Sequence, residues 1–293
     1  MSIHPAARQR ISTRVKDVGG IAVSRALPVR ERRTIGAWCF LDHAGPALFE
    51  YGQEGLQVAP HPHIGLQTFT WMLDGEVLHR DSLGYRQRIR PGQVNLMTAG
   101  RGIAHSEDTP AGIDRLHAAQ LWIALPEAER DMAPRFDHYP DLPRWQDGGV
   151  SCTLLVGDYG AHRAPTLHFS PLIGIDIAAR EAASVDLVLR EDFEYGLFVL
   201  EGSAAADGEP VAANELLYLG EGLTSLAVSL SAGGRALLLG GEKLNEPVMM
   251  WWNFVGRSKA ELQAAVAAWN SGDPRFGRVV DDPRAPTPSP VIP

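Results

Sequence analysis

The segment APHPHIGLQTF, residues 59–69, places two histidines on either side of a proline, within a run that otherwise resembles a β-strand. On a strand, residues i and i+2 point to the same face, so His61 and His63 aim their imidazoles together while Pro62 faces away. Proline cannot donate to a sheet ladder, which confines this segment to a strand end or a bulge. Such a pair can bind a metal ion, although two histidines in a surface loop would have the same sequence.

A second pair with the same spacing follows a glycine turn. His105 and Glu107 lie in TAGRGIAHSED, residues 98–108. On neighbouring strands the two pairs would bring three imidazoles and one carboxylate to one point, a set that suits a divalent transition metal and leaves open positions for substrate or oxygen. Taken alone, His105 and Glu107 could also be a surface ion pair beside a turn. The same alternation predicts which residues face the interior that the histidines point into: Gln67, Phe69 and Trp71.

Other histidines and one arginine have weaker patterns. His43, in LDHAG, is predicted to hold a turn or a domain contact, and His79, beside Arg80 and Asp81, to be a solvated loop residue. Arg101 could offset the charge of the carboxylate, attract an anionic substrate or stabilise its turn. Four histidines have no partner pattern: His117, His138, His162 and His168.

Cysteines and clustered aromatic residues are assigned to packing. Cys39 and Cys152 have no base nearby in the sequence and are expected to be inert. The group Trp251, Trp252 and Phe254 is expected to pack in a core or between domains.

The elements that must position these residues are mostly strands. Glycines and prolines punctuate short apolar runs such as GLQTFTWML, QVNLMTA and YGLFVLEG, a pattern typical of all-β proteins. One helix is predicted over 258–270, because Ser258 and Glu261 form a capping box and Leu262, Val266 and Trp269 share one face. The proline-rich segment DDPRAPTPSPVIP is expected to be extended, either draped on the surface or disordered.

An internal repeat indicates two related halves. Residues 69–97 and 196–219 each contain an apolar strand ending in an acidic residue and glycine, a polar hairpin, a turn and a second apolar strand. The predicted division is a metal-binding domain 1–130, a linker 131–148 and a second domain 149–293. In the second half the positions that match the histidine pair fall near Val188 and Arg190, and no histidine follows Ala213–Asn214, so no metal is expected there.

Composition excludes several classes of protein. The net charge of −8 without a basic run argues against direct binding of nucleic acid. Two distant cysteines fit a reducing compartment, and the first residues contain no apolar stretch of a secretory signal. The longest apolar runs are too short to span a bilayer, so a soluble, cytoplasmic protein without membrane partners is expected.

The chain resembles a known family. Gly55 followed by the histidine pair resembles the cupin pattern, and a fuller set resembles the pirin branch: FLDHAGP (40–46), HPHIGLQT (61–68), HRDSLG (79–84), IRPGQVNLMTAGRGIAHSE (89–107) and PVMMWWNFVGRS (247–258). The resemblance implies an all-β bicupin, with two antiparallel cupin β-barrels packed together, a short C-terminal helix and a metal in the N-terminal barrel. It also implies that the ligands are His61, His63, His105 and Glu107. Gln67 departs from the pattern, because metal-binding cupins commonly have glutamate there.

The resemblance also implies a function. It predicts one divalent metal per chain, Fe(II) first, with Zn, Mn, Ni, Co or Cu as alternatives. The expected activity is that of a quercetin 2,3-dioxygenase-like oxidoreductase that opens a flavonol with dioxygen, with Glu107 both as ligand and as catalytic base. One alternative is a non-catalytic, redox-responsive metal-binding regulator that acts through a protein partner. Another is metal-assisted isomerase or hydrolase chemistry.

Overall fold

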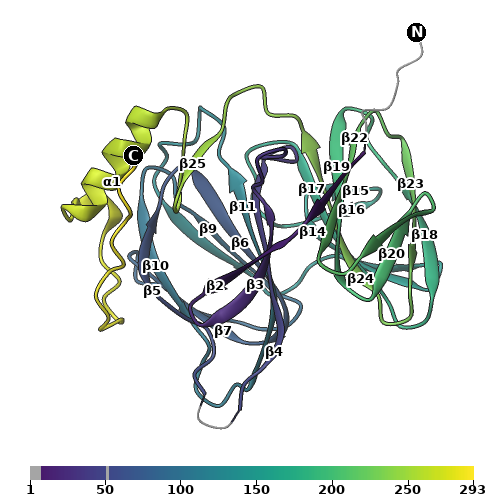
Figure 1. The fold of residues 1–293 in the computed structure, drawn as a ribbon, viewed down its shortest axis with the longest axis horizontal. Helices are drawn as coiled ribbons and strands as arrows, with labels where there is room; N and C mark the ends of the chain where they lie inside the picture. The colour runs from purple at the N-terminus through teal and green to yellow at the C-terminus, as the bar shows by residue number, and fades with distance from the viewer. Residues whose placement is uncertain (1–7, 51–52) are drawn as a thin grey trace. The chain divides into compact units, whose positions relative to one another are not determined.

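The computed structural model describes residues 8–50 and 53–293, and the chain forms two compact units (Figure 1). Unit one contains the described residues 8–15 with Ser24–His43 and Asp141–Leu244. Unit two contains Lys16–Val23, Ala44–Pro140 and Asn245–Pro293. These segments differ from the predicted domains 1–130 and 149–293. Each unit is formed by pairing between segments that are far apart in the chain, whereas the prediction assumed that each domain is one continuous segment.

Unit two is built on two facing sheets. The smaller has the order β5 (Gln57–His63), β10 (Ile103–Asp108), β7 (Val77–Asp81), β8 (Arg86–Ile89). The larger has the order β12 (Arg135–Tyr139), β9 (Val94–Thr98), β6 (Leu66–Gly75), β11 (Arg115–Ala124), β4 (Trp38–Leu48), β3 (Ile21–Leu27), β2 (Arg14–Val18), and the unit boundaries fall inside β2, β3 and β4. Apolar side chains of both sheets, among them Met72, Val77, Ile89 and Ala118, pack together in one core cluster.

Unit one, like unit two, contains a larger and a smaller sheet. Its larger sheet has the order β1 (Gln9–Ser12), β22 (Glu215–Glu221), β19 (Phe193–Glu201), β24 (Arg235–Glu242), β17 (Leu172–Ala179), β14 (Val150–Val156), β13 (Arg144–Asp147). Its smaller sheet has the order β18 (Ala183–Val188), β23 (Ser225–Leu230), β20 (Ser203–Ala206), β21 (Glu209–Ala212), and a short ribbon pairs β15 (Asp158–Tyr159) with β16 (His162–Arg163).

The predicted repeat is confirmed by strand pairing. β6 pairs with β9 and β7 with β8 in unit two, as β19 pairs with β22 and β20 with β21 in unit one. By the same correspondence, β18 and β23 of unit one take the places of β5 and β10. The sequence places the positions that match the histidine pair near Val188 and Arg190. Val188 pairs with the first residue of β23, as His63 pairs with the first residue of β10, but Val188 is 75% exposed, and Val185 and Leu187 point into the apolar core of unit one.

The stretch predicted as a linker contains two strands. β12 pairs with β9 and β13 with β14, each at the edge of a large sheet. Edge strands tolerate charged residues and flanking prolines, so the composition of residues 131–148 resembled a linker.

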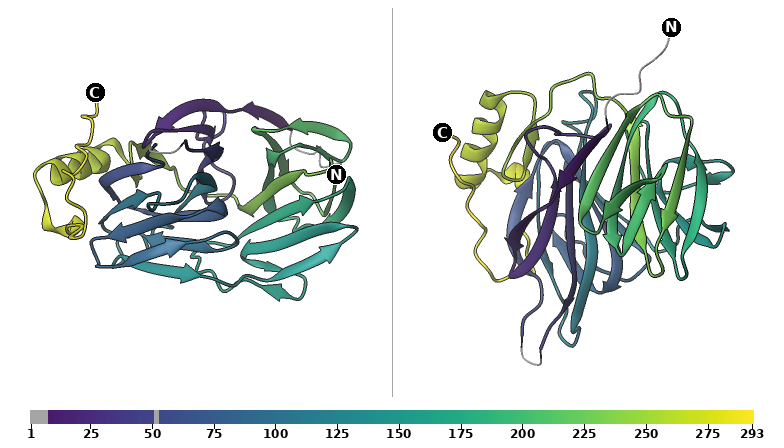
Figure 2. Two further views of the ribbon diagram at one scale, coloured as in Figure 1. Left: turned by 90° about the horizontal axis from the view of Figure 1, so that it is seen from below. Right: turned by 45° about the vertical axis from the view of Figure 1, so that its right-hand side comes forward.

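The helix and the tail belong to unit two. α1 (Lys259–Asn270) begins after the N-cap Ser258, whose hydroxyl accepts from the backbone N–H of Glu261, and a 3-10 turn follows at η1 (Pro274–Phe276). In a capping box the Glu261 carboxylate would accept a hydrogen bond from the backbone N–H of Ser258. Here it accepts one from the backbone N–H of Arg257. The helix packs on the hairpin of β25 (Met249–Trp251) and β26 (Phe254–Gly256), which lies beside β5 (Figure 2).

The proline-rich tail is extended along the surface, one of the two predicted outcomes. The Thr287 N–H donates to the carbonyl of Pro60, and the indole N–H of Trp251 to that of Pro290. Within residues 8–50 and 53–293, no helix has the length and apolar character that crossing a membrane requires.

Candidate metal centre

The strand that carries the first histidine pair lies at a sheet edge and contains a bulge. β5 is the outermost strand of its sheet, where proline is tolerated because no ladder partner needs its N–H. His61 stands opposite His105 and Val58 opposite Glu107, so two residues of β5 face the single Ser106 of β10. With one residue fewer, His61 would point to the other side of the sheet. The sequence predicted that Pro62 lies at a strand end or in a bulge. Pro62 is paired in register with Ala104 and precedes His63, the last residue of β5, so it lies at a strand end, whereas the bulge contains Ala59 and Pro60.

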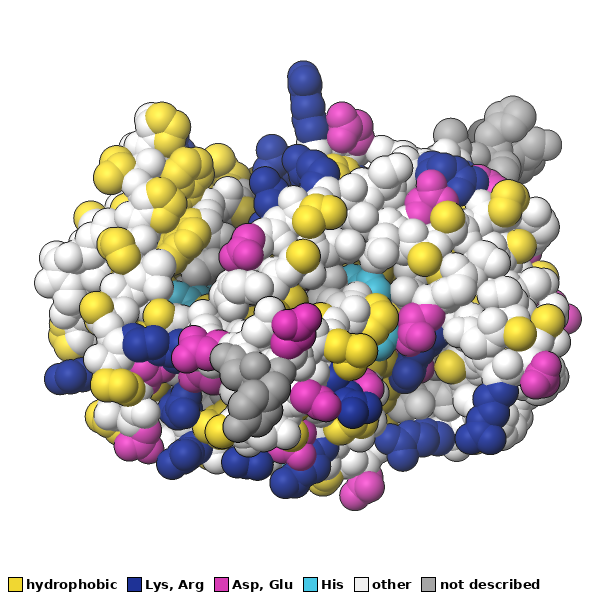
Figure 3. Space-filling model, turned by 60° about the horizontal axis from the view of Figure 1, so that its bottom comes forward, with side chains coloured by type: hydrophobic (Ala, Val, Ile, Leu, Met, Phe, Trp, Pro, Cys, Tyr) yellow, Lys and Arg dark blue, Asp and Glu magenta, His cyan; other side chains and the backbone are white. Residues whose placement is uncertain are grey.

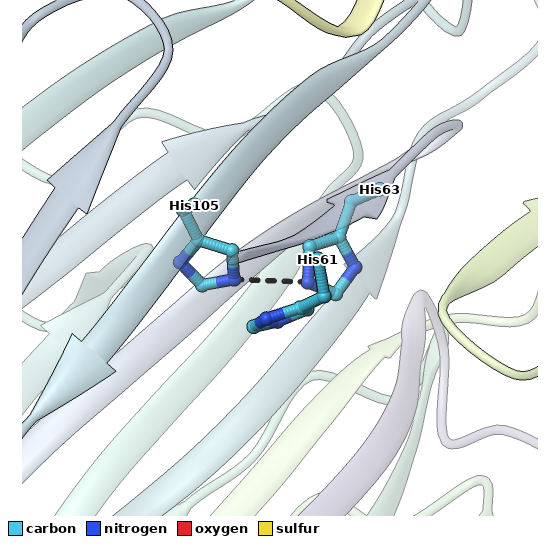
Figure 4. Close-up of side chains that lie close together, drawn as sticks. All are labelled: His61, His63 and His105. Atoms are coloured by element: carbon cyan, nitrogen blue, oxygen red, sulfur yellow. Dashed lines mark hydrogen bonds between the residues drawn. The ribbon is translucent and has the colours of Figure 1, made fainter. Parts of the chain in front are cut away.

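The bulge brings three imidazoles together (Figure 4). The ring centroids of His61, His63 and His105 are 4.3 to 5.0 Å apart, and one nitrogen from each lies within 4.8 Å of the others. The Nε2 atoms of His63 and His105 are 3.0 Å apart. The three residues are only 8%, 2% and 1% exposed. Figure 3 shows a few histidine side chains in hollows of one face of the molecule.

The hydrogen bonds at Nδ1 decide which nitrogen of each ring is free. His61 Nδ1 lies 2.9 Å from the carbonyl oxygen of Ala59, and His63 Nδ1 lies 3.0 Å from that of Asn253. A carbonyl oxygen only accepts, so both Nδ1 atoms carry the proton and both Nε2 atoms present lone pairs. The two rings are thus held with their ligating nitrogens turned toward the cluster.

Burial keeps these rings neutral. Desolvation lowers the pKa of His61 to about 4, and it lowers the pKa of His63 and His105 well below the ordinary value, with the neighbouring imidazoles adding to the effect. A neutral imidazole is the form that binds a metal ion. The cluster is therefore in the ligating protonation state at neutral pH.

Glu107 lies on the same strand as His105 but falls in a second, overlapping group. One ligand atom from each of His79, His105 and Glu107 lies within 4.8 Å of the others, so the two groups share His105. Glu107 is half-buried, and burial together with the charge of Asp108 raises the pKa of its carboxyl to about 7. The role of Glu107 as a ligand stays a prediction.

The prediction for His79 is wrong. His79 lies on β7, is only 2% exposed and stacks on Phe136, with ring centroids 4.4 Å apart. Its Nδ1 atom is 3.3 Å from Nδ1 of His105, and its Nε2 atom is 3.1 Å from the Asp81 carboxylate. The polar neighbours suggested a solvated hairpin, whereas the alternation of His79 and Asp81 at i and i+2 was the signal for a strand facing the cluster.

The prediction for Gln67 is also wrong. Trp122 contacts the ring of His63 from the facing sheet, and it stands opposite Thr68 in the ladder of β11 and β6. Thr68 therefore shares the interior face with Trp122, and Gln67, Phe69 and Trp71 lie on the opposite face. The side-chain amide of Gln67 donates to the hydroxyl of Thr98 on that face. Gln67 is accordingly not placed as a ligand.

The remaining candidates serve the framework. His43 is buried and its Nδ1 atom lies 2.7 Å from Oδ1 of Asn214, which confirms a structural role within unit one. His138 bonds Asn95, and Arg101 is exposed. Both cysteines are buried and neither forms a disulfide, and burial raises the pKa of Cys152 to about 12, so that thiol is unreactive.

The aromatic group of the second unit packs in a core. Phe254 is fully buried beside Leu262 and Phe276, and Trp251 and Trp252 cover that cluster. The packing assignment made from the sequence is confirmed. Both candidate metal groups found among residues 8–50 and 53–293 lie in unit two.

Comparison with known proteins gives matches along almost the whole chain. The family model Pirin matches residues 20–123, and the model Pirin C-terminal cupin domain matches residues 174–277. A Pseudomonas aeruginosa protein named "Putative quercetin 2,3-dioxygenase PA1205" is 57% identical over 288 residues, which are 97% of this chain and 91% of that protein. A "Pirin-like protein" of Caulobacter vibrioides is 35% identical over 266 residues, covering 88% and 91% of the two chains.

The solved structures agree with these relatives. A crystal structure of quercetin 2,3-dioxygenase from Acinetobacter baumannii has a TM-score of 0.95 and 47% identity, covering 98% of this chain and 96% of that one. A bacterial pirin of Escherichia coli in complex with nickel(II) has a TM-score of 0.65 at 19% identity, covering 81% and 100%, a likeness of fold. Two family models and full-length relatives lead to one conclusion: the chain belongs to the pirin family.

Proposed function

We propose that this chain is a metal-dependent dioxygenase that opens the ring of a flavonol such as quercetin, with one Fe(II) held by His61, His63, His105 and Glu107. The names of the Pseudomonas aeruginosa relative and of the Acinetobacter baumannii structure support the reaction. The geometry of the three histidines supports the metal.

The observation that carries the proposal is the approach of the His63 and His105 Nε2 atoms to 3.0 Å. Two lone pairs at that distance repel each other, and either a proton on one of the two nitrogens or a metal cation between them removes the repulsion. A single metal ion would be within reach of both nitrogens at this separation, so His63 and His105 would hold the same ion. The three imidazoles and the nearby carboxylate form a donor set of the kind that suits iron and related metals.

The reaction needs a proton acceptor near the substrate. When bound, divalent iron supplies the Lewis-acid and one-electron chemistry that allows a flavonol to react with dioxygen. Glu107 takes the proton of the flavonol hydroxyl at its carboxylate. The pKa of about 7 suits this role, because a general base works best when its pKa lies near the working pH. Coordination lowers the basicity of a carboxylate, so the two roles of Glu107 oppose each other.

Aromatic side chains on the facing sheet complete the site. Trp122 lies edge-on to His63, with centroids 5.2 Å apart, and Phe136 stacks on His79. Flat aromatic surfaces of this kind suit the fused rings of a flavonol. In this account Trp122 and Phe136 orient the substrate, and the histidines hold the metal.

The proposal is tested by oxygen uptake with iron-loaded protein and quercetin. Wild type should consume oxygen, and His61→Ala should not. The control His162→Ala removes a histidine of unit one that stacks on Trp145, and it should keep the activity. Iron bound at one equivalent without oxygen uptake would overturn the dioxygenase and favour a metal-binding regulator that acts through a partner.

A further inference from the structure

The buried side chains of His79 and Asp81 lie on the Nδ1 side of His105. The His105 Nδ1 atom is 3.3 Å from Nδ1 of His79, and the Nε2 atom of His79 is 3.1 Å from Oδ2 of Asp81. We propose that His79, held in place by Asp81, is a positioning residue. Its Nδ1 atom accepts a hydrogen bond from the Nδ1–H group of His105, which turns the Nε2 lone pair of His105 toward the other two imidazoles. This inference rests on the proposed function, in which that lone pair binds the metal.

The carboxylate of Asp81 is anchored as an acceptor. Its Oδ1 atom accepts from the backbone N–H groups of Leu83, at 2.9 Å, and Tyr85, at 3.0 Å. Its Oδ2 atom faces His79 Nε2, which must therefore carry the proton. In the neutral ring the Nδ1 atom of His79 is then a lone pair, and the proton between the two Nδ1 atoms belongs to His105.

Packing fixes the plane of the supporting ring. His79 stacks on Phe136 at an interplanar angle of 14°, and Phe136 in turn contacts Tyr85, with centroids 5.2 Å apart. In the ladder of β10 and β7, His105 stands opposite Asp81 and Glu107 opposite His79, so the four side chains share one face. The acceptor is thus rigid as well as correctly placed.

The third histidine differs from the other two in its support. His61 and His63 donate to the backbone carbonyls of Ala59 and Asn253, which no substitution of those residues removes. His105 alone of the three meets a side chain at Nδ1. Outer partners of this kind orient metal ligands, and their loss commonly costs about 10- to 100-fold in metal affinity.

The test measures Zn²⁺ affinity by competition with a chelating dye, which needs no catalysis. His79→Leu should weaken Zn²⁺ binding by about 10- to 100-fold. His79→Asn, whose side-chain oxygen can take the position of Nδ1 and accept the same hydrogen bond, should restore most of the affinity. His138→Leu, which removes a half-buried histidine bonded to Asn95, is the matched control and should bind as wild type does.

A second readout follows the protons directly. Long-range ¹H–¹⁵N NMR spectra of the metal-free wild type, labelled at histidine, should show His79 protonated at Nε2 and His105 at Nδ1. The opposite assignment, or unchanged Zn²⁺ affinity in a folded His79→Leu protein, would overturn the proposal. X-ray absorption of zinc-loaded His79→Leu that lacks one nitrogen ligand would overturn it too, because His79 would then bind the metal itself. If wild type bound no Zn²⁺, the proposed function would fail, while the NMR spectra would still decide the role of His79.

Discussion

His61 and His105 stand directly opposite each other in the ladder of β5 and β10, with ring centroids 4.3 Å apart. This pairing depends on the bulge in β5, since the register fixed by Val58 and Glu107 would otherwise turn His61 to the other face. The Thr287 N–H, from the tail, donates to the carbonyl of Pro60 within that bulge. The position of His61 in the candidate metal centre thus depends on the bulge in β5.

Replacing any one of the three clustered histidines by alanine should release the metal. Each variant removes a nitrogen from a group whose members lie within 4.8 Å of one another. We expect affinity for Zn²⁺ to fall by at least about 100-fold, more than for an outer partner. Elemental analysis should give one metal per wild-type chain and far less in the variants. Two metals per wild-type chain would contradict a single centre.

Glu107→Gln should change how stability depends on pH in the metal-free protein. The pKa of Glu107 is raised from 4.5 to about 7, so the folded state binds this proton more tightly than the unfolded state does. Stability therefore falls as pH rises from about 4.5 to about 7, and above 7 the buried charge is fully unfavourable. Glutamine lacks the charge, so the variant should exceed wild type by on the order of 1–3 kcal/mol at pH 8 and match it at pH 5.

Urea unfolding with a chelator present measures this difference. The other titrating groups are common to both proteins and cancel in the comparison. If the free energies of unfolding of the variant and of wild type differed by the same amount at pH 5 and pH 8, Glu107 would not titrate in this range. With metal bound the order should reverse at pH 8, because the carboxylate then has a cation as partner.

Gly65→Ala should disturb the centre through the backbone. Gly65 has φ +68°, and a Cβ atom there would lie 2.3 Å from the carbonyl oxygen of Val255, in the hairpin whose Asn253 carbonyl holds His63. We expect a loss of at least about 2 kcal/mol in stability, together with weaker metal binding. Gly84→Ala is the matched control, since Gly84 has φ +93° but open space around it. Equal losses in the two variants would refute the steric account.

Asp282→Asn should weaken the attachment of the tail. Asp282 is buried and paired with Arg284, which also binds Asp108 at the end of β10. Arg284 lowers the pKa of Asp282, so this stabilisation is present above the ordinary pKa of 3.8 and is lost as pH falls below it. We expect the variant to lose about 1–3 kcal/mol at pH 7 and less at pH 3. The exposed neighbour Asp281 provides the control Asp281→Asn, which should have no effect at either pH.

Local patterns predicted much of this molecule. The i and i+2 spacing of His61 and His63 placed both rings on one face, and Ser258 marked the start of the helix. The errors arose where the position of a residue depends on the pairing of strands that are far apart in the sequence. The alternation that starts at His63 does not continue to Gln67, because Gly65 turns the chain between β5 and β6, which belong to different sheets.

The role of His79 was hidden for a similar reason. Its neighbours Arg80 and Asp81 are typical of an exposed hairpin, but Arg80 points to the other side of β7 and pairs with Asp108. Only the arrangement of β7 beside β10 shows that His79 and Asp81 face the cluster. Sequence spacing can place residues on one face of a strand, and it cannot say which strand lies next to it.

Anomalous X-ray diffraction from crystals of the iron-loaded protein, recorded above and below the iron absorption edge, locates the bound iron within the chain. We expect one anomalous peak per chain, at about 2.1 Å from the Nε2 atoms of His61, His63 and His105. A peak elsewhere in the chain, or none near these nitrogens at full iron occupancy, would contradict the proposed metal centre.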